Sequence, residues 1–217
     1  MSDTAASRDA ILGRIRSAYR PRISDAERME QYAALPRDYV RAIDEDIAAR
    51  LRLFVERLRE YDTGVHQASP DTVSAVIAAV LQRRGKRRLA IPQGLPASWL
   101  PQGFEFISAD RLMPLEIDRF DGIITGCTLG IALTGSLVLQ KADAQGPRAL
   151  SLVPDYHLCV VFADQVVDTV PEAFERLAKT SRLPTTFISG PSATADIEMT
   201  RIKGVHGPRF LDVVLVS

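Results

Sequence analysis

The spacing of hydrophobic residues in the first part of the chain predicts helices. Apolar side chains return every three or four positions over residues 11–19 and again over residues 40–58. This spacing places an apolar stripe along one face of a helix. The polar face of the second segment carries Asp46 and Arg50, which are spaced for an i,i+4 ion pair. We therefore expect residues 1–62 to form a helical N-terminal extension rather than a separate core.

After residue 62 the pattern changes to short apolar runs. Ser69, Pro70 and Asp71 form a helix-start pattern ahead of apolar residues at helical spacing, and Gly85 follows as a stop. The later runs are short, and loops rich in Pro and Gly separate them, as is typical of buried strands. The predicted strands cover residues 88–91, 104–107, 121–125, 132–140, 150–153, 158–162, 185–189 and 211–216.

The lengths of the connections predict how these strands pair. Between residues 132 and 162 the runs follow one another so closely that only turns can join them, and turns join antiparallel strands. A further short helix opens at Pro171, with Phe174 and Leu177 expected to face inward. We therefore predict an α/β fold, a mixed sheet flanked by helices, with its domain spanning residues 63–217.

Charge and cysteine content narrow the class of protein. Lys and Arg together number 27 and Asp and Glu also number 27, so we expect no nucleic-acid partner. Cys127 and Cys159 are too few for a disulfide framework or a four-thiolate cluster, and we expect both to be core residues. The N-terminus lacks the pattern of a signal peptide, and no apolar run approaches the roughly 20 residues of a membrane helix. We therefore expect a cytoplasmic protein without membrane insertion.

Several catalytic and cofactor-binding motifs are absent from the sequence. Gly126, Gly130 and Gly135 do not have the G-x-G-x-x-G spacing, and no phosphate-binding Walker loop occurs. Ser192 lacks the second glycine of the G-x-S-x-G nucleophile motif. The three histidines form no H-E-x-x-H pair. We therefore expect neither a cofactor nor a metal site in this chain.

What remains is a set of turns in which glycine stands beside a hydroxyl residue. Glycine lets a ligand approach the backbone, adjacent N–H groups form a concave surface, and Ser or Thr hydroxyls add donors for a carboxylate or phosphate. Tight turns and helix caps would use the same residue types. The candidate ligand-binding residues in these turns are Thr125, Gly126, Thr134, Gly135, Ser136, Gly190, Ser192 and Thr194.

Three titratable residues near the C-terminus are candidates for proton transfer. Asp196, Glu198 and His206 supply two carboxylates and an imidazole, the groups that usually act as general acids and bases. Each also has a structural alternative. Asp196 could cap backbone donors, Glu198 could pair with Arg201 or Lys203, and His206 could brace a Gly-Pro turn.

Taken together, the motifs of the C-terminal half resemble the LUD-domain family, and within it the lactate-utilization proteins. The resemblance extends in order and spacing over this half, and the N-terminal helices fit more loosely. It is carried by Thr125-Gly126-Cys127, Thr134-Gly135-Ser136, Arg148 before Ser151-Leu152-Val153-Pro154, His157, Gly190-Pro191-Ser192, Asp196-Ile197-Glu198 and Gly204-Val205-His206-Gly207-Pro208.

The resemblance implies a fold like that of the NagB/RpiA/CoA-transferase group. It also implies an accessory role in oxidising L-lactate to pyruvate beside iron–sulfur partner proteins, with no redox centre in this chain, and it adds Arg148 and Gly207 to the ligand-binding candidates. Leu133 stands where members of the family usually have an acidic residue, which removes a candidate carboxylate from that turn. A stand-alone enzyme or sensor for a small phosphorylated, carboxylated or CoA-linked metabolite is the alternative function.

Overall fold

The computed structural model describes residues 3–19, 23–41, 43, 46–195, 201–203 and 206–217. The chain divides into two compact units, residues 1–39 and residues 40–217. Helix α3 therefore belongs to the same unit as the strands, whereas the division at residue 62 that we expect from the sequence stays a prediction. Among the described helices, none combines the length and the apolar character that crossing a bilayer requires.

The first unit consists of two helices, α1 (Asp3–Ala18) and α2 (Asp25–Ala33). The pattern over residues 11–19 is confirmed as helical by α1, whereas α2 lies in a stretch for which no helix was expected. A capping box starts α2: the Ser24 hydroxyl accepts a hydrogen bond from the Glu27 amide at 3.1 Å, and the Glu27 carboxylate accepts one from the Ser24 amide at 2.7 Å. Local hydrogen bonds thus define α2, and the helix has no buried residue.

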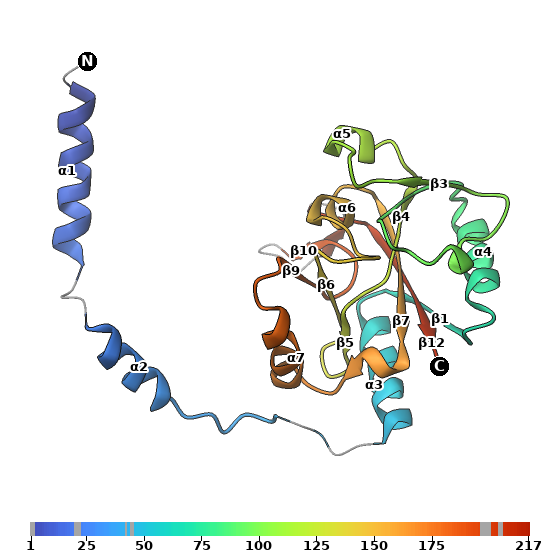
Figure 1. Ribbon diagram of the computed structural model, residues 1–217, viewed down its shortest axis with the longest axis horizontal. Coiled ribbons are helices and arrows are strands. Elements are labelled where there is room, and N and C mark those ends of the chain that lie inside the picture. The colour runs from blue at the N-terminus through green and yellow to red at the C-terminus, as the bar shows by residue number, and fades with distance from the viewer. Residues whose placement is uncertain (1–2, 20–22, 42, 44–45, 196–200, 204–205) are drawn as a thin grey trace. The chain divides into compact units, whose positions relative to one another are not determined.

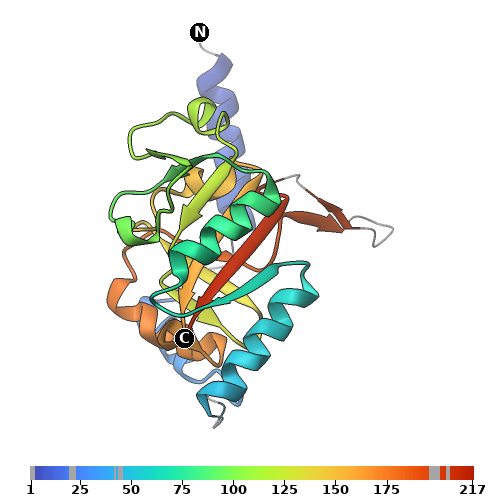
Figure 2. The same cartoon turned by 90° about the vertical axis from the view of Figure 1, so that its right-hand side faces the viewer.

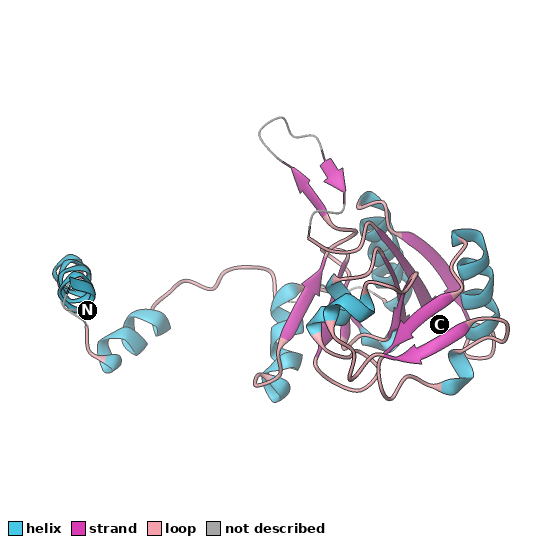
Figure 3. Cartoon of the chain, turned by 90° about the horizontal axis from the view of Figure 1, so that it is seen from above, coloured by secondary structure: helices cyan, strands magenta, loops and turns pink. Residues whose placement is uncertain are grey.

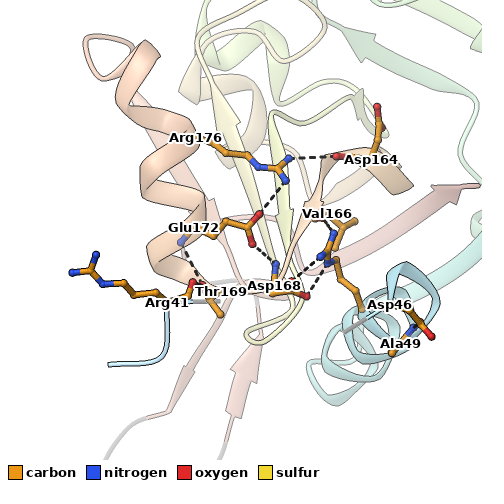
Figure 4. Close-up of polar contacts among 10 residues, drawn as sticks. Arg41, Asp46, Ala49, Asp164, Val166, Asp168, Thr169, Glu172 and Arg176 are labelled. Atoms are coloured by element: carbon orange, nitrogen blue, oxygen red, sulfur yellow. Dashed lines mark hydrogen bonds and ion pairs between the residues drawn. The ribbon is translucent and has the colours of Figure 1, made fainter. Parts of the chain in front are cut away.

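Helix α3 (Ile47–Glu60) opens the second unit and begins later than its apolar pattern predicts. The Asp46 carboxylate accepts a hydrogen bond from the Ala49 amide at 2.6 Å, which fixes the start of the helix. The expected pair between Asp46 and Arg50 is therefore wrong. Arg50 instead donates two hydrogen bonds of 2.7 Å to Asp168. Asp168 is buried in the chain segment between β8 (Val166–Val167) and α7 (Val170–Leu177), where Figure 4 shows it beside Thr169 and Glu172.

The larger of two main sheets has six strands in the order β1-β12-β7-β4-β2-β3, and every pair in it is parallel. Figure 1 shows α4 (Val73–Arg84) on one side of β7 and β12, and β5 (Leu129–Ile131) and β6 (Ser136–Gln140) on the other. Two apolar cores follow from this arrangement, one under α4 and one shared by α3 and the second sheet. The strands are β1 (Gly64–Ala68), β2 (Arg88–Ile91), β3 (Glu105–Ser108), β4 (Gly122–Thr125), β7 (Tyr156–Phe162) and β12 (Phe210–Val216).

The second sheet has four strands in the order β8-β5-β6-β9 and is mixed, because β5 pairs parallel with β8 and antiparallel with β6. A separate antiparallel hairpin, β10 with β11, projects from the two sheets (Figures 2 and 3). These strands are β5 (Leu129–Ile131), β6 (Ser136–Gln140), β8 (Val166–Val167), β9 (Thr185–Ile188), β10 (Ala193–Ala195) and β11 (Arg201–Lys203).

Helices and short 3-10 turns connect the strands, and with them the α/β class expected from the sequence is confirmed. Gly85 ends α4 in the left-handed conformation at φ 65°, as its stop pattern predicts. The same helix begins at Val73 rather than beside Ser69, because the Ser69 amide donates to the Thr72 hydroxyl and forms a turn before it. The helical segments are α4 (Val73–Arg84), α5 (Pro114–Ile117), α6 (Arg148–Leu152), α7 (Val170–Leu177), η1 (Ala97–Trp99), η2 (Ala163–Gln165) and η3 (Ala178–Thr180).

Three local expectations are corrected between residues 132 and 177. The apolar run over residues 150–153 is not a strand, because α6 buries Leu150 on one helical face. The strands within residues 132–162 do not pair with one another, since β6 and β7 belong to different sheets. Phe174 does not face inward, because it is 57% exposed and its ring stacks on that of Phe187 with the ring centroids 5.7 Å apart. Leu177 is buried as expected.

A buried ionic cluster explains part of a basic run, Arg83-Arg84-Gly85-Lys86-Arg87-Arg88, that begins at the end of α4. Asp212 of β12 is 1% exposed and accepts hydrogen bonds from Arg84 at 2.7 and 3.0 Å, while His66 Nε2 lies 3.1 Å from its carboxylate. Burial alone would raise the pKa of Asp212, but the hydrogen bonds with His66 and Arg84 outweigh burial and lower that pKa to about 2. The carboxylate is therefore ionised, and Arg84 has a structural role.

Candidate functional site

A cavity of about 290 Å³ lies where β7 and β12 begin, beside α6 and the end of β9. Its wall combines chain segments that are far apart in the sequence, from α6 to the residues just before β12. A concave wall built from distant chain segments is the usual form of a ligand site. This cavity lies at the amino ends of β7 and β12, whereas open α/β sheets usually bind ligands at the carboxyl ends of their strands. The residues of this wall that the sequence analysis singled out are Arg148, Gly190, Ser192, His206 and Gly207.

The turn around Gly190 forms one side of this cavity, and its shape requires glycine. Gly190 has φ 84°, and a Cβ atom there would lie 2.4 Å from Cβ of Tyr61. The turn is tied to the segment before β12, because the Ser192 amide donates to the Pro208 carbonyl at 2.8 Å and the His206 amide donates to the Ser192 hydroxyl at 3.1 Å. These bonds hold the two sides of the cavity together.

The hydroxyls of the second predicted turn reach this cavity only indirectly. The Thr134 and Ser136 hydroxyls lie 2.8 Å apart, and the Ser136 hydroxyl lies 2.6 Å from that of Ser189, which lines the cavity. Gly135 packs elsewhere: a Cβ atom on it would lie 2.7 Å from the Arg57 backbone in α3. Thr134 and Ser136 thus support the wall through a chain of hydroxyl groups. Gly135 lets the turn pack closely against the backbone of α3.

The first predicted turn contributes to the cavity through a histidine. Thr125 is fully buried, and its hydroxyl lies 2.7 Å from Nε2 of His157, which lines the cavity and is 1% exposed. Nδ1 of His157 has no hydrogen-bond partner among the described residues. The Gly126 amide donates to the Ala144 carbonyl at 2.8 Å and is not part of the cavity wall.

Burial keeps the His157 ring neutral. Desolvation in the protein interior disfavours the imidazolium form and lowers the pKa of His157 to about 3. At neutral pH the ring therefore carries one proton, bound to one of its two nitrogens. The neutral ring can donate or accept a hydrogen bond with a ligand, but it does not supply a positive charge.

Replacement of His157 by leucine is expected to reduce the acid sensitivity of the fold. The pKa of His157 falls from 6.5 to about 3 on folding, so below pH 6.5 the unfolded chain binds a proton that the folded chain excludes. Stability from this group is therefore present above pH 6.5 and is lost as the pH falls toward 3, by up to about 1.4 kcal/mol per pH unit. Urea unfolding of both proteins between pH 7 and about pH 4 measures the two slopes, and equal slopes would contradict this assignment.

Some predicted site residues cannot be compared with the cavity. Asp196 and Glu198 lie outside the described residues, and Thr194 is placed only as part of β10. Leu133, which stands where an acidic residue was expected, is 42% exposed, and its amide donates to the Asp168 carbonyl at 3.0 Å.

Ser189 and His157 line the cavity without having been singled out as site residues. The signals for His157 were its place among the residues that carry the family resemblance and its position beside the apolar run of β7.

Comparison with known proteins gives consistent matches over most of the second unit. The sequence profile of the LUD domain matches residues 51–216. Lactate utilization protein C of Deinococcus radiodurans is 42% identical over 170 residues, which cover 77% of this chain and 79% of that protein. Lactate utilization protein C of Halalkalibacterium halodurans is 37% identical over 111 residues, covering 48% of this chain and 47% of that protein.

A solved structure shows the same fold. The crystal structure of a DUF162 family protein from Deinococcus radiodurans superposes with a TM-score of 0.71 and is 38% identical in sequence. The match covers 80% of this chain and 99% of that one. The α/β arrangement described above is therefore shared with an experimentally determined structure.

Proposed function

This chain belongs to the LUD-domain family, and on that premise we propose that it serves in L-lactate utilization as an accessory component without a redox centre of its own. The observation that carries the proposal is the 42% identity to a lactate utilization protein C over 79% of that protein's length. As part of the same proposal, we infer that the fold is like that of the NagB/RpiA/CoA-transferase group. A parallel sheet with packed elements on both faces supports it.

Electron transfer is assigned to partner proteins in this proposal. The chain has two cysteines, Cys127 and Cys159, and a cluster held by four thiolates needs four. Both thiols are buried in the apolar core shared by α3 and the second sheet, which confirms their expected location. Oxidation of L-lactate to pyruvate would therefore pass its two electrons to iron–sulfur partners. This chain would bind the lactate or pyruvate, or would help to assemble the complex of those partners.

Reconstitution of lactate oxidation tests the proposed function. Iron–sulfur lactate-utilization proteins, purified separately, are assayed for lactate-dependent reduction of an electron acceptor with and without this chain. We expect the rate to depend on the chain and the chain to co-purify with at least one of these proteins. Equal rates in both assays, together with no co-purification, would contradict the proposal.

The cavity favours a second function, in which the chain binds a small anion without any partner. Its described wall includes Arg148 and the hydroxyls of Ser189 and Ser192, which together can receive a negatively charged group. At about 290 Å³ the cavity is near the lower end of ligand pockets, which span about 300–1,000 Å³. This size favours a compact phosphorylated or carboxylated metabolite over a whole CoA thioester. The second function would make the isolated chain an enzyme or a sensor.

A further inference from the structure

One buried polar atom beside the cavity lacks a partner within the described part of the chain. His157 is 99% buried and lines the cavity, and its Nδ1 atom accepts or donates no hydrogen bond there. Leaving such an atom unsatisfied costs roughly 1–3 kcal/mol, and the great majority of buried polar atoms are paired. This nitrogen is therefore available to a molecule bound in the cavity, and the atoms that now cover it would have to shift for the hydrogen bond to form.

The partner of the other ring nitrogen decides where the single proton of His157 resides. The Thr125 hydroxyl is fully buried and has His157 Nε2, at 2.7 Å, as its partner among the described residues. If Nε2 carried the proton, the hydroxyl hydrogen of Thr125 would have no acceptor there. If Thr125 donates to Nε2, the hydroxyl is satisfied and the ring proton is on Nδ1. The hydrogen-bond arrangement thus makes Nδ1–H a neutral donor, which suits an oxygen acceptor.

The charged groups of the cavity wall complement a single negative charge. Arg148 lines the cavity, and its guanidinium forms no ion pair with any residue that the structure describes. No Asp or Glu is among the described residues of the wall. A guanidinium can bind a carboxylate through two parallel hydrogen bonds. Among the described residues of the wall, Arg148 carries the permanent positive charge, and the other basic side chains are the imidazoles of His157 and His206. One permanent cation fits a monoanion better than a dianionic phosphate.

The rest of the wall is suited to a short aliphatic group. Leu152, Ile188 and Leu211 line the cavity together with the two prolines at positions 191 and 208. These side chains offer apolar contact beside the polar groups, the usual composition of a site for a small metabolite. The wall therefore combines a place for a carboxylate, a place for a neutral oxygen and a place for a methyl group.

We propose that this cavity binds a short 2-oxo or 2-hydroxy monocarboxylate, with Arg148 at the carboxylate and His157 Nδ1–H donating to the oxygen on carbon 2. The inference deepens the proposed function and rests on it for the choice among short acids, because lactate and pyruvate both belong to this class. Thr125 is a positioning residue in this arrangement, since it acts on the ligand only through the proton of His157.

Calorimetric titration of the full chain with four probes tests the ligand class. Pyruvate and L-lactate have the carboxylate and the oxygen on carbon 2, and propionate has only the carboxylate. Inorganic phosphate lacks the carbon skeleton and is a mixture of monoanion and dianion at neutral pH. We expect saturable binding of pyruvate, L-lactate or both, and binding of propionate about three- to tenfold weaker, because one neutral hydrogen bond is lost. Phosphate binding tighter than that of both acids, or no saturable binding of either acid, would overturn the proposal.

Two substitutions with a matched control test the location. Arg148→Gln is expected to weaken binding of the better acid at least tenfold, and His157→Leu about three- to tenfold. Arg182→Gln removes the same charge from an exposed arginine that does not line the cavity, so its affinity should equal that of the unchanged chain. Unchanged affinity in Arg148→Gln, or an equal loss in Arg182→Gln, would contradict the assignment.

A spectroscopic test remains available if a variant fails to fold. The chain has three histidines, so the ¹⁵N signals of His157 can be assigned in the unchanged protein. We expect its shifts to report the Nδ1–H form and the Nδ1 signal to move on addition of the acid, while Thr125→Val reduces the share of this form. An Nε2–H form, or an Nδ1 signal that does not respond to a bound acid, would overturn the role of His157.

The outcomes for this inference and for the proposed function can be told apart. If the chain supports reconstituted lactate oxidation but binds none of the acids, the ligand inference fails and the function stands. If it binds pyruvate or lactate in the cavity but leaves the reconstituted rate unchanged, the function fails and the site stands.

Discussion

Replacing Asp212 with alanine is expected to lower the free energy of unfolding by about 3–5 kcal/mol, the usual cost of removing one partner of a buried ion pair. Asp212 is 1% exposed and receives both hydrogen bonds of Arg84, so its removal leaves that guanidinium without its carboxylate. His66 loses the same partner. Urea unfolding at pH 7 and constant salt measures the change.

The double substitution Asp212→Leu with Arg84→Met is the control for this expectation. It removes both charges and fills the space with apolar atoms, so we expect it to be close to neutral or to cost far less than Asp212→Ala. A loss below about 1 kcal/mol in Asp212→Ala would show that the pair is already well solvated. Because the folded pKa of about 2 lies below the ordinary value of 3.8, stability from Asp212 is present above pH 3.8 and is lost as the pH falls toward 2.

Replacing Gly135 with alanine is expected to cost about 2–5 kcal/mol, for two reasons that add. Gly135 has φ 56°, where a residue with a side chain is strained by roughly 1–2 kcal/mol. An added Cβ would also lie 2.7 Å from the carbonyl carbon of Arg57 and 2.9 Å from the amide nitrogen of Leu58, and backbone cannot move aside as a flexible side chain can. Overpacking of this kind costs about 1–3 kcal/mol. Thermal or urea unfolding measures the loss.

Gly85→Ala is the matched control, because it carries the conformational strain without the clash. Gly85 has φ 65°, and a Cβ atom there would meet nothing within 4 Å. We expect Gly85→Ala to cost only about 1–2 kcal/mol. Equal losses in the two variants would contradict the packing role of Gly135 against α3. The expected difference would show that this glycine is needed for the fold, whether or not its turn contacts a ligand.

The secondary structure could be predicted where local rules decide it. The limits of β2 coincide with the apolar run over residues 88–91, and Gly85 ends α4 where its conformational freedom predicts. Residues 150–152 lie in a helix and Val153 caps it. The predicted strand was wrong because a four-residue apolar run has no periodicity that separates a strand from one face of a buried helix. Local rules also do not predict which strands pair with one another. The link between β6 and β7 contains α6 and joins two different sheets rather than an antiparallel pair.

The candidate site could be predicted in part for the same reason. Gly190 and Ser192 were found because glycine and hydroxyl residues in turns have a local pattern, and Gly207 was found through the family resemblance. All three line one cavity. A local pattern does not show how far a side chain lies from a cavity. Thr134 and Ser136 have the expected pattern, but their hydroxyls lie behind Ser189 instead of at the wall. The importance of His157 depends on its burial and on Thr125, 32 positions earlier in the chain, and neither is visible in the residues around it.

The connection between the cavity and lactate utilization can be tested in one assay. Lactate-dependent reduction of an electron acceptor is measured in the reconstituted system with the unchanged chain, with Arg148→Gln and with Arg182→Gln, after all three are shown to be folded and to bind the iron–sulfur partners equally. We expect Arg148→Gln to lower the rate at limiting lactate at least tenfold, because its carboxylate contact is lost, and Arg182→Gln to leave the rate unchanged. Equal rates for all three proteins would show that the cavity is not where this chain acts in lactate oxidation.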